Sequence, residues 1–527
     1  MSSIGAGLES PGLKTWRSAE RLFDAAFGPG LNPLRHLGAI GMLAFALLLG
    51  SGIVLYVLFD TSAQLAWRSV DRLDDLPLAS GRWLRGLHRY SADLLVISLA
   101  LHLLREWLHH HERGFRRFSW LTGVPLIPLA FAAAIVGFWL NWDALGQYSA
   151  IASAEWIDSL PGLASPLARN FLVSAQVSDR LFSLWVFVHI GVPLLMVFGL
   201  WFHVQRISRP AWMPPKRLLL GTVLMLSGLA LLLPVRSHDP ALLAEVPQAL
   251  RLDWILLFIH PLVDLVGGPW VWLGVAGAAL LLTGLPWLPS RRVSLPVAVV
   301  DAANCNGCQR CFADCPYAAI TMRTHPNQRV GRLLAVVDAE LCAGCGICAG
   351  ACPSSTPFRS GETLVTGIDM PALPIQVLRQ QLREGLQAAR RNAPQAPGPV
   401  VVFRCARGAD RVAAEGTLTF DLICAGQLPP SFVEYALRDG AGGVAVSACC
   451  DGACEFRFGE RWTAQRLAGT REPHLRASVA AAHWRLVQTR PGDEALLAET
   501  IDRLRDHPAS LARPSPSASS PAGNPTP

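Results

Sequence analysis

The sequence is poor in charge, contains no cysteine before residue 305 and shows none of the common signatures of side-chain catalysis. Only 16% of its 527 residues are charged and 51% are hydrophobic, and the mean hydropathy is +0.33, which excludes an ordinary soluble protein. We find no phosphate-binding loop, dinucleotide fingerprint or nucleophile–base pair, so we expect bound cofactors to carry the chemistry. The net charge of +7 is nearly all arginine placed between apolar runs, a pattern that favours a membrane over nucleic acid.

Six apolar segments are long enough to be transmembrane helices. They cover residues 37–58, 88–108, 122–140, 181–203, 217–234 and 254–288, the last being a short interfacial piece followed by a span at about 269–288. The loops after the second, fourth and sixth segments are basic around Arg113, Arg206 and Arg291, whereas the other loops contain several acids. Because cytoplasmic loops are enriched in arginine and lysine, we expect the N-terminal segment 1–35 and everything after residue 290 to face the cytoplasm. No compact apolar region precedes residue 35, so we expect no cleavable signal peptide.

Two of these segments each contain a pair of histidines fourteen residues apart. The second has His88 and His102, and the fourth has His189 and His203. Fourteen helical steps bring a side chain back to within roughly 40° of its starting direction, about 21 Å further along the axis. Antiparallel packing would then pair His88 with His189 near the outer side and His102 with His203 near the cytoplasmic side. Two such pairs can clamp two metal macrocycles stacked across the membrane.

Glycines repeat the same spacing in the first and third segments. Gly38 and Gly52 lie fourteen residues apart, as do Gly123 and Gly137. Glycine lets a backbone approach a flat macrocycle closely, so we expect these four positions to flank the cofactors. The alternative is four core histidines and ordinary packing glycines, which four pairs with one shared spacing disfavour.

Residues 36–205 resemble the four-helix haem core of cytochrome b from quinol-oxidising bc-type complexes. The resemblance rests on "SGIVLYV", "WRSVDRL", "GRWLRGLH", "WLTGVPL", "LNWDALGQYSA" and "HIGVP", which stand in that order. It implies a core domain at 36–210 that binds two b-type haems, with Arg85 and Arg105 holding haem propionates.

Residues 216–289, within an expected region of two further transmembrane helices at 211–290, resemble the smaller subunit of such complexes. That family has a Pro-Glu-Trp-Tyr quinol motif where this chain has "RLDWILL". By the resemblance, Asp253 replaces the acid of a quinone site. The alternative is that Asp253 is only an interfacial acid beside an anchoring tryptophan.

All 13 cysteines lie between Cys305 and Cys454, and eight of them form two compact runs. "CNGCQRCFADCP" and "CAGCGICAGACP" each follow the C-x2-C-x2-C-x3-C-P pattern of two-cluster ferredoxins, in which the fourth cysteine ligates the other cluster. We therefore expect a ferredoxin domain at 296–356 that holds two [4Fe–4S] clusters. Its expected ligands are Cys305, Cys308, Cys311 and Cys352 for cluster one, and Cys342, Cys345, Cys348 and Cys315 for cluster two. Two complete runs disfavour zinc, which takes four ligands, and such clustering favours a reducing compartment over disulfides.

A helical, proline-containing connector is expected at 357–398, a small α/β domain at 399–505, and a disordered Pro/Ser-rich tail at 506–527. "VVFRCARGAD", "DLICAGQLPPSFVEYALRDGAGGVAV" and "SACCDGACEFRFG" resemble the iron–sulfur delta subunit of methyl-viologen-reducing hydrogenases. That small protein passes electrons between a hydrogenase and a heterodisulfide-reductase-type partner.

By this resemblance the C-terminal domain binds a [2Fe–2S] cluster, and the choice between Cys449 and Cys450 as a ligand stays open. The expected ligands are Cys405, Cys424, Cys449 and Cys454. The family tends to have a second cysteine and a histidine where this chain has Gly408 and Glu455, so the cluster type also stays open. The alternative is a structural or zinc-binding domain.

The expected fold is multi-domain: an all-α, cytochrome b-like transmembrane bundle of about six spans, then an α+β ferredoxin-like domain and a small α/β domain. The expected function is electron transfer between cytoplasmic iron–sulfur partners and the quinone pool, by a quinone-linked oxidoreductase or its electron-transfer subunit. Ferredoxin-type clusters can lie near about −400 mV, and moving an electron inward against the membrane potential costs about 2.3 kcal/mol per 100 mV. Both terms favour flow from clusters to quinone.

The expected partners are quinone or quinol, membrane lipid and a cytoplasmic hydrogenase or heterodisulfide-reductase-like complex, without nucleic acid. A homodimer is one of the assemblies considered. The expected location is the inner membrane of a bacterium or archaeon. One rival function is a membrane anchor and electron relay without its own quinone site. A redox sensor is a weaker rival, because nothing resembles an output domain.

Overall fold

The computed structural model describes residues 10–160, 177–245, 249–289, 296–326, 332–353 and 364–507. The chain divides into two compact units, Gly7–Ser294 and Leu295–Pro527, and each is described by itself. The expected tail beyond residue 507 and the basic pair Arg291 and Arg292 lie outside the described residues.

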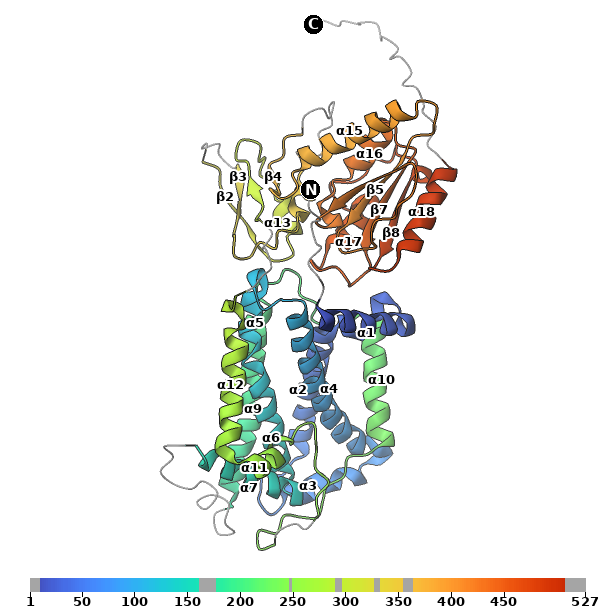
Figure 1. Cartoon of the computed structure of the whole chain (residues 1–527). Helices are drawn as coiled ribbons and strands as arrows, with labels where there is room; N and C mark the ends of the chain where they lie inside the picture. The colour runs from blue at the N-terminus through green and yellow to red at the C-terminus, as the bar shows by residue number, and fades with distance from the viewer. Residues whose placement is uncertain are drawn as a thin grey trace, which may run out of the picture. The chain divides into compact units, whose positions relative to one another are not determined.

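The first unit is helical (Figure 1). Its α-helices are α1 (Pro11–Phe27), α2 (Leu37–Leu58), α3 (Ala66–Asp71), α4 (Ser80–Leu108), α5 (Arg117–Gly123), α6 (Leu126–Asn141), α7 (Ala144–Asp158), α9 (Asp179–Val204), α10 (Lys216–Leu232), α11 (Ile259–Val266) and α12 (Gly268–Gly284). The structure contains four helical segments long and apolar enough to cross a membrane within the described residues: Leu37–Leu58, Gly114–Asn141, Asp179–Val204 and Gly268–Trp287.

Helices α4 and α10 form where the second and fifth spans are expected, but they are not among these four segments. Arg89 and Asp93 lower the hydropathy of α4, and α10 has only 17 residues. The overlong sixth segment is divided as expected into the short α11 and the longer α12, because Gly267 between them adopts a φ of 91°.

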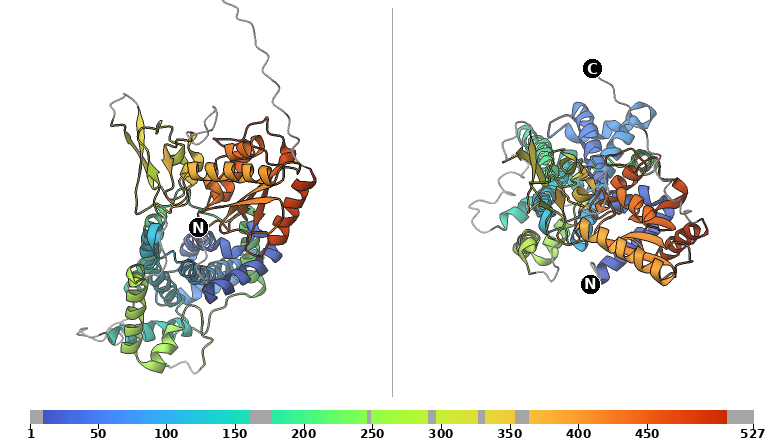
Figure 2. Two further views of the ribbon diagram at one scale, coloured as in Figure 1. Left: turned by 45° about the horizontal axis from the view of Figure 1, so that its top comes forward. Right: turned by 90° about the horizontal axis from the view of Figure 1, so that it is seen from above.

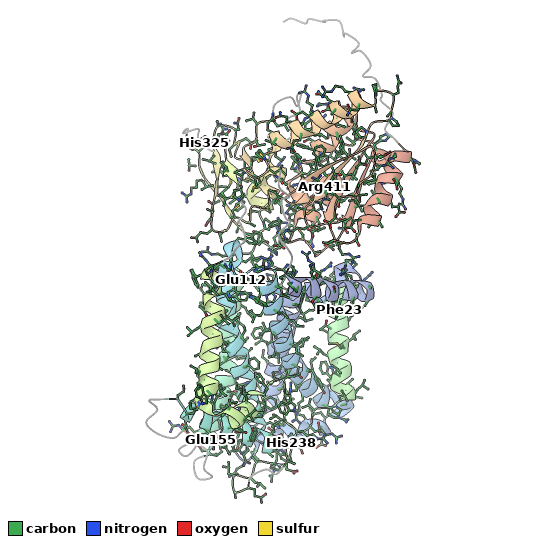
Figure 3. All side chains as sticks on the ribbon, viewed as in Figure 1. Phe23, Glu112, Glu155, His238, His325 and Arg411 are labelled. Atoms are coloured by element: carbon green, nitrogen blue, oxygen red, sulfur yellow. The ribbon has the colours of Figure 1, made fainter. Side chains whose placement is uncertain are left out.

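The bundle core forms where α2 packs on α4 and α6 packs on α9 (Figures 1 and 2). Ala44, Phe45, Leu95, Ala130 and Met196 meet there and are buried. Burying such side chains fully is worth about 1.5–3 kcal/mol each for the larger ones. Figure 3 shows Phe23 and Glu112 at one end of this unit and Glu155 and His238 at the other, so the two sets of loops are well separated.

The segment 1–35 contains the helix α1, which the sequence analysis does not predict. Ser10 caps it by accepting a hydrogen bond from the Leu13 N–H at 3.3 Å. Its buried face contains Leu13 and Trp16, and Trp16 packs with residues at the start of α2. The helix is therefore amphipathic, with an apolar stripe that faces the bundle.

The second unit begins with the cysteine-rich segment. Two short antiparallel pairs form there: β1 (Val299–Val300) with β4 (Ile368–Asp369), and β2 (Ile320–Thr324) with β3 (Leu333–Val337). A one-turn helix lies within each cysteine run: α13 (Arg310–Asp314) in the first and α14 (Ile347–Ala351) in the second. In each run the cysteines lie on the loop and on this short helix, so the chain wraps around a small volume.

The rest of the second unit is built on a four-stranded parallel sheet in the order β6-β5-β7-β8, of which Figure 1 labels β5, β7 and β8. Its elements are α15 (Ile375–Asn392), β5 (Val400–Cys405), β6 (Thr417–Leu422), α16 (Ser431–Arg438), β7 (Gly443–Cys449), α17 (Gly459–Leu467), β8 (Trp484–Thr489) and α18 (Glu494–Asp506). Leu497 and Ile501 of α18 pack on one face against Val400 and Val402. Phe432 of α16 contacts Phe403 on the other face, at 6.1 Å between ring centroids. Cys405 and Cys449 are the last residues of the adjacent parallel strands β5 and β7. Both cysteines therefore lie at the same carboxyl edge of the sheet.

Candidate redox centres

The four membrane histidines meet in two pairs, His88 with His189 and His102 with His203. The ring centroids are 6.3 Å apart in the first pair and 6.4 Å apart in the second. Two imidazole nitrogens that each bind one metal ion at about 2 Å leave their ring centroids roughly 6 Å apart. Both spacings therefore fit one axially ligated iron between each pair of rings.

Each histidine lies against one of the four spaced glycines. A Cβ added at Gly52 would lie 3.2 Å from the Cε1 atom of His88, and one added at Gly38 would lie 3.6 Å from that of His102. At Gly123 and Gly137 the added Cβ would come within 2.9 Å of His203 and His189, respectively. The glycines thus leave room for the histidine rings and for a flat group beside them.

We predict that Gly137→Val lowers haem binding, because even the first added carbon is too close to His189. The measurement is the b-type haem content of the purified chain by pyridine haemochrome. Gly191→Val is the matched control: it lies two residues from His189 on α9, and an added Cβ there meets no described atom within 4 Å. Equal haem content in both variants would contradict the assignment of Gly137.

Hydrogen-bond partners occupy the Nδ1 side of three rings and so direct Nε2 toward the partner helix. The Nδ1 atom of His88 lies 2.9 Å from Ser51 Oγ, that of His189 lies 2.9 Å from the Ala133 carbonyl oxygen, and that of His203 lies 3.4 Å from Thr122 Oγ1. Such second partners orient a metal-binding histidine and fix its tautomer. Ser51 and Thr122 escaped the sequence analysis because a hydroxyl in an apolar helix has no distinctive spacing.

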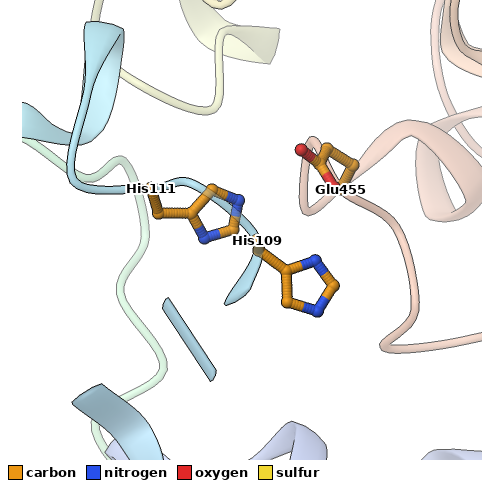
Figure 4. Close-up of side chains that lie close together, drawn as sticks. All are labelled: His109, His111 and Glu455. Carbon is orange, nitrogen blue, oxygen red and sulfur yellow. The ribbon is translucent and has the colours of Figure 1, made fainter. Parts of the chain in front are cut away.

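His102 differs, because a carboxylate is its neighbour. Its Nδ1 atom lies 3.9 Å from Glu106 Oε1, one helical turn further along α4. Glu106 also binds Arg105 at 2.9 Å, Arg116 at 2.8 Å and His111 Nδ1 at 2.6 Å. Figure 4 shows His109 and His111 on the turn that follows α4, where their rings stack at 5.5 Å. This charged network closes the end of the bundle beside the second histidine pair.

The two expected propionate partners have different surroundings. Arg85 Nη2 lies 2.9 Å from Ser237 Oγ, and its buried Nη1 has no hydrogen-bond partner among the residues that the structure describes. That orphaned donor fits a carboxylate of a bound cofactor. Arg105 is instead paired with Glu106 and, at 3.7 Å, with Glu20 of α1.

Asp253 lies outside any helix and is tied into an ion pair. Its Oδ2 binds Arg89, which also binds Asp93 at 2.6 Å. Its Oδ1 accepts hydrogen bonds from two backbone N–H groups, those of Ile255 at 3.0 Å and Leu256 at 2.9 Å. The carboxylate therefore already holds a turn together.

The eight ferredoxin-type cysteines surround two cavities in the second unit, four around each. Cys305, Cys308, Cys311 and Cys352 line one cavity, hereafter cavity one. Cys315, Cys342, Cys345 and Cys348 line the other, hereafter cavity two. The grouping, including the exchange of the fourth cysteine between runs, is the one that the ferredoxin spacing predicts for the two ligand sets.

Burial makes these thiols poor thiolates on their own. It raises the pKa of Cys311 to about 12 and the pKa of Cys348 well above its ordinary value. A metal centre binds the thiolate form and releases the proton. The donor set and the lining thus fit two iron–sulfur clusters, with Cys308 the exposed member of the first set.

Four of the five remaining cysteines, Cys405, Cys424, Cys449 and Cys454, form a ring of sulfur atoms at the carboxyl edge of the sheet. Cys405 and Cys454 each accept hydrogen bonds from Cys424 and Cys449, which lowers the pKa of Cys405 and of Cys454. The Sγ atoms of Cys405 and Cys449 are 3.5 Å apart. Cys449 is therefore a member of this ring. Gly408 and Glu455 occupy the two positions where the delta-subunit pattern differs, and Glu455 pairs with Arg407 at 3.3 Å.

Glu460 is a buried acid beside this ring. Burial and the negative charge of Cys454 raise the pKa of Glu460 to about 10. The carboxyl group is therefore protonated at neutral pH and can donate a hydrogen bond to the sulfur. The sequence analysis missed it, because an acid six residues after the last cysteine follows no known ligand spacing.

We predict that Gly459→Ala prevents the C-terminal cysteines from holding a cluster. The added Cβ would lie 2.1 Å from Cys424 Sγ and 3.2 Å from Cys454 Sγ, so one of these ligands must move. Iron content and the electron paramagnetic resonance spectrum should show loss of one centre only. Gly385→Ala on α15 is the control, since its added Cβ comes no closer than 3.4 Å to Leu418; identical spectra for both variants would refute the prediction.

Three family models match successive parts of the chain. Residues 23–209 match cytochrome b/b6, residues 304–356 match the 4Fe-4S dicluster domain, and residues 408–510 match the delta subunit of methyl-viologen-reducing hydrogenase. Successive segments of the chain are thus similar to these three families, in the order that the sequence motifs predict. The matches and the four apolar helices support a membrane electron-transfer protein: cytochrome b implies haem, and the dicluster domain implies iron–sulfur clusters.

Among solved structures, the chain is similar to a chain of "Hyperthermophilic respiratory Complex III". The sequence identity is 17% and the TM-score 0.42, and the similarity covers 52% of this chain and 83% of that one.

Proposed function

We propose that this chain transfers electrons between a cytoplasmic iron–sulfur redox partner and the membrane quinone pool. The cofactors of the proposal are two b-type haems, two [4Fe–4S] clusters and one [2Fe–2S] cluster. The observation that carries it is the pair of histidine contacts at 6.3 and 6.4 Å, each flanked by its two glycines. Four unrelated core histidines would have no reason to meet in this way.

The residues would share the work as follows. His88 with His189 and His102 with His203 would hold the haems, and Arg85 would bind a propionate. Cavity one, cavity two and the C-terminal ring would hold the three clusters. When bound, these groups would act as one-electron carriers. The chain would fix the distances between them and shield them from water.

The topology of the proposal has six spans, with α4 and α10 added to the four most apolar helices. The charged pair on α4 supports this, because Arg89 and Asp93 neutralise each other at 2.6 Å and a paired charge is less costly in lipid. In the proposal both the N-terminus and the unit from residue 295 face the cytoplasm, and the basic loops support this orientation. The membrane would be the inner membrane of a bacterium or archaeon.

Quinone linkage is tested with membranes that contain the full chain. After reduction with dithionite and removal of excess reductant, a quinone analogue is added and the b-type haem band is followed. We expect rapid reoxidation, and a band that stays reduced would contradict the quinone link.

Asp253 is the proposed acid of the quinone site, and we predict that Asp253→Asn abolishes quinone-dependent reoxidation. Asp93→Asn is the matched control, because it removes the other carboxylate of Arg89 without touching the proposed site. If both variants reoxidise at the wild-type rate, Asp253 is a structural acid only.

The second candidate function is a membrane anchor and relay for a hydrogenase or heterodisulfide-reductase-like complex, without a quinone site. The surroundings of Asp253 favour it, because Arg89 and two backbone N–H groups already engage the carboxylate. Wild-type membranes whose haems accept electrons from the soluble complex but never pass them to quinone would support this function instead.

A further inference from the structure

A fully buried arginine, Arg466, contacts both the ferredoxin-like segment and the C-terminal sheet domain. Arg466 of α17 is 1% exposed. Its Nη2 atom lies 2.6 Å from Asp314 Oδ2 and 3.4 Å from the Ile347 carbonyl oxygen, and its Nη1 atom donates to the Gly426 carbonyl oxygen at 2.9 Å. A guanidinium is suited to this task, since its planar fork presents several donors in fixed directions.

These three acceptors stand next to expected cluster ligands. Asp314 precedes Cys315, and Ile347 precedes Cys348, both of which line cavity two. Gly426 lies two residues after Cys424 of the C-terminal ring. Arg466 therefore links the two backbone segments that present cavity two and the ring.

Glycines bring the same two segments into backbone contact. A Cβ at Gly350 of α14 would lie 2.2 Å from the Gly426 carbonyl oxygen, and one at Gly426 would lie 2.8 Å from Ile347 Cγ1. Gly346, in cavity two, faces Gln427 with an added Cβ at 2.8 Å. At Gly350 the nearest atom is backbone, and at the other two glycines the side chain of Ile347 or Gln427 packs directly on the glycine.

Two further hydrogen bonds join the rim of cavity two to residues that follow Cys454, the last cysteine of the ring. The Tyr317 hydroxyl donates to the Glu455 carbonyl oxygen at 3.2 Å, and Arg457 donates to the Pro316 carbonyl oxygen at 3.2 Å. At cavity one, Arg332 donates to the Cys305 carbonyl oxygen at 2.8 Å, a contact within the ferredoxin-like segment, and Arg310 beside Cys311 pairs with Glu472 at 3.3 Å.

We propose that Arg466 is a positioning residue that holds cavity two against the C-terminal ring, making these two sites the pair that exchanges electrons directly. Cavity one is then the next site along the chain. In the exchange one electron is lost at the ring and one is gained at cavity two, and the cytoplasmic iron–sulfur reductant of the proposed function replaces the lost electron. The inference rests on that function, because it assumes that both sites hold clusters.

The test is electron paramagnetic resonance of the full chain with its clusters, reduced in steps. We expect the signal of the C-terminal centre to broaden as the cavity-two centre becomes reduced. Cys345→Ala should abolish the broadening, whereas Cys308→Ala, which removes an exposed ligand of cavity one, should leave it. The reverse result would overturn the order of sites.

Arg466→Met should weaken the broadening while the iron content stays at the wild-type value. Arg471→Met is the matched control: Arg471 also binds Asp314, with its Nε at 3.1 Å, but the acceptors near Cys348 and Cys424 belong to Arg466. Arg466→Lys covers the case in which the methionine variant does not fold, since it keeps the charge but not the fork, and it should show a partial loss.

Full broadening in every folded Arg466 variant would overturn the positioning role. A chain that contains no iron and gives no cluster signal would instead refute the proposed function. The two failures are therefore distinguishable.

Discussion

His203→Ala is expected to leave one b-type haem per chain where the native protein binds two. The lost haem is the one between α4 and α9 at the His102 level, because His203 is the ring that faces His102 at 6.4 Å. The other pair, His88 and His189, lies fourteen residues away on both helices and keeps its own glycines. Pyridine haemochrome analysis should therefore show half the native haem content, and potentiometry should show one midpoint in place of two.

His238→Gln serves as the control for this experiment. His238 also belongs to the helical unit and interacts with a carboxylate, Asp143, at 3.6 Å, but it is not part of either ring pair. Its variant should keep both haems. Loss of all haem in His203→Ala with a folded chain, or retention of both haems, would contradict two independent bis-histidine sites.

The second large effect is expected at the C-terminal ring, where Cys449→Ser should remove one cluster and Cys450→Ser should not. The reason is a closed set of hydrogen bonds between the side chains: Cys449 is hydrogen-bonded to Cys405 and Cys454, and Cys424 is hydrogen-bonded to the same two. Iron per chain and the electron paramagnetic resonance signal of this centre are the measurements.

The paired variants control for each other, since both replace one of two adjacent buried cysteines by serine. Loss of the centre in Cys450→Ser alone would show that the ring is not the ligand set. The spectrum of the native chain also distinguishes a [2Fe–2S] centre from other cluster types.

The histidine pairs and the cysteine grouping were predictable because each depends on a regular period. A spacing of fourteen returns a side chain to the same face of a helix, and the repeated cysteine run determines which ligands can surround one small volume. Helix α1 was not predictable by these means. Its apolar stripe is interrupted by Glu20 and Asp24, which are buried with polar partners: Trp16 donates to Glu20 at 2.9 Å, and Arg35 pairs with Asp24 at 2.7 Å.

The contacts missed from the sequence are those that join distant positions without a repeating pattern. Asp314 and Arg466 are 152 residues apart, and an isolated acid and an isolated arginine have no signature until the fold brings them together. The same holds for Arg89 and Asp253. The resemblance to a quinol motif indicates an acid at Asp253, whereas the ion pair that occupies it depends on how α4 packs against a later turn.

The most direct test of the account is the number of protohaem groups bound to the purified full-length polypeptide. Pyridine haemochrome analysis against protein concentration should give two b-type haems per chain. A folded, membrane-extracted chain without b-type haem would contradict the assignment of all four histidines and, with it, the proposed respiratory role.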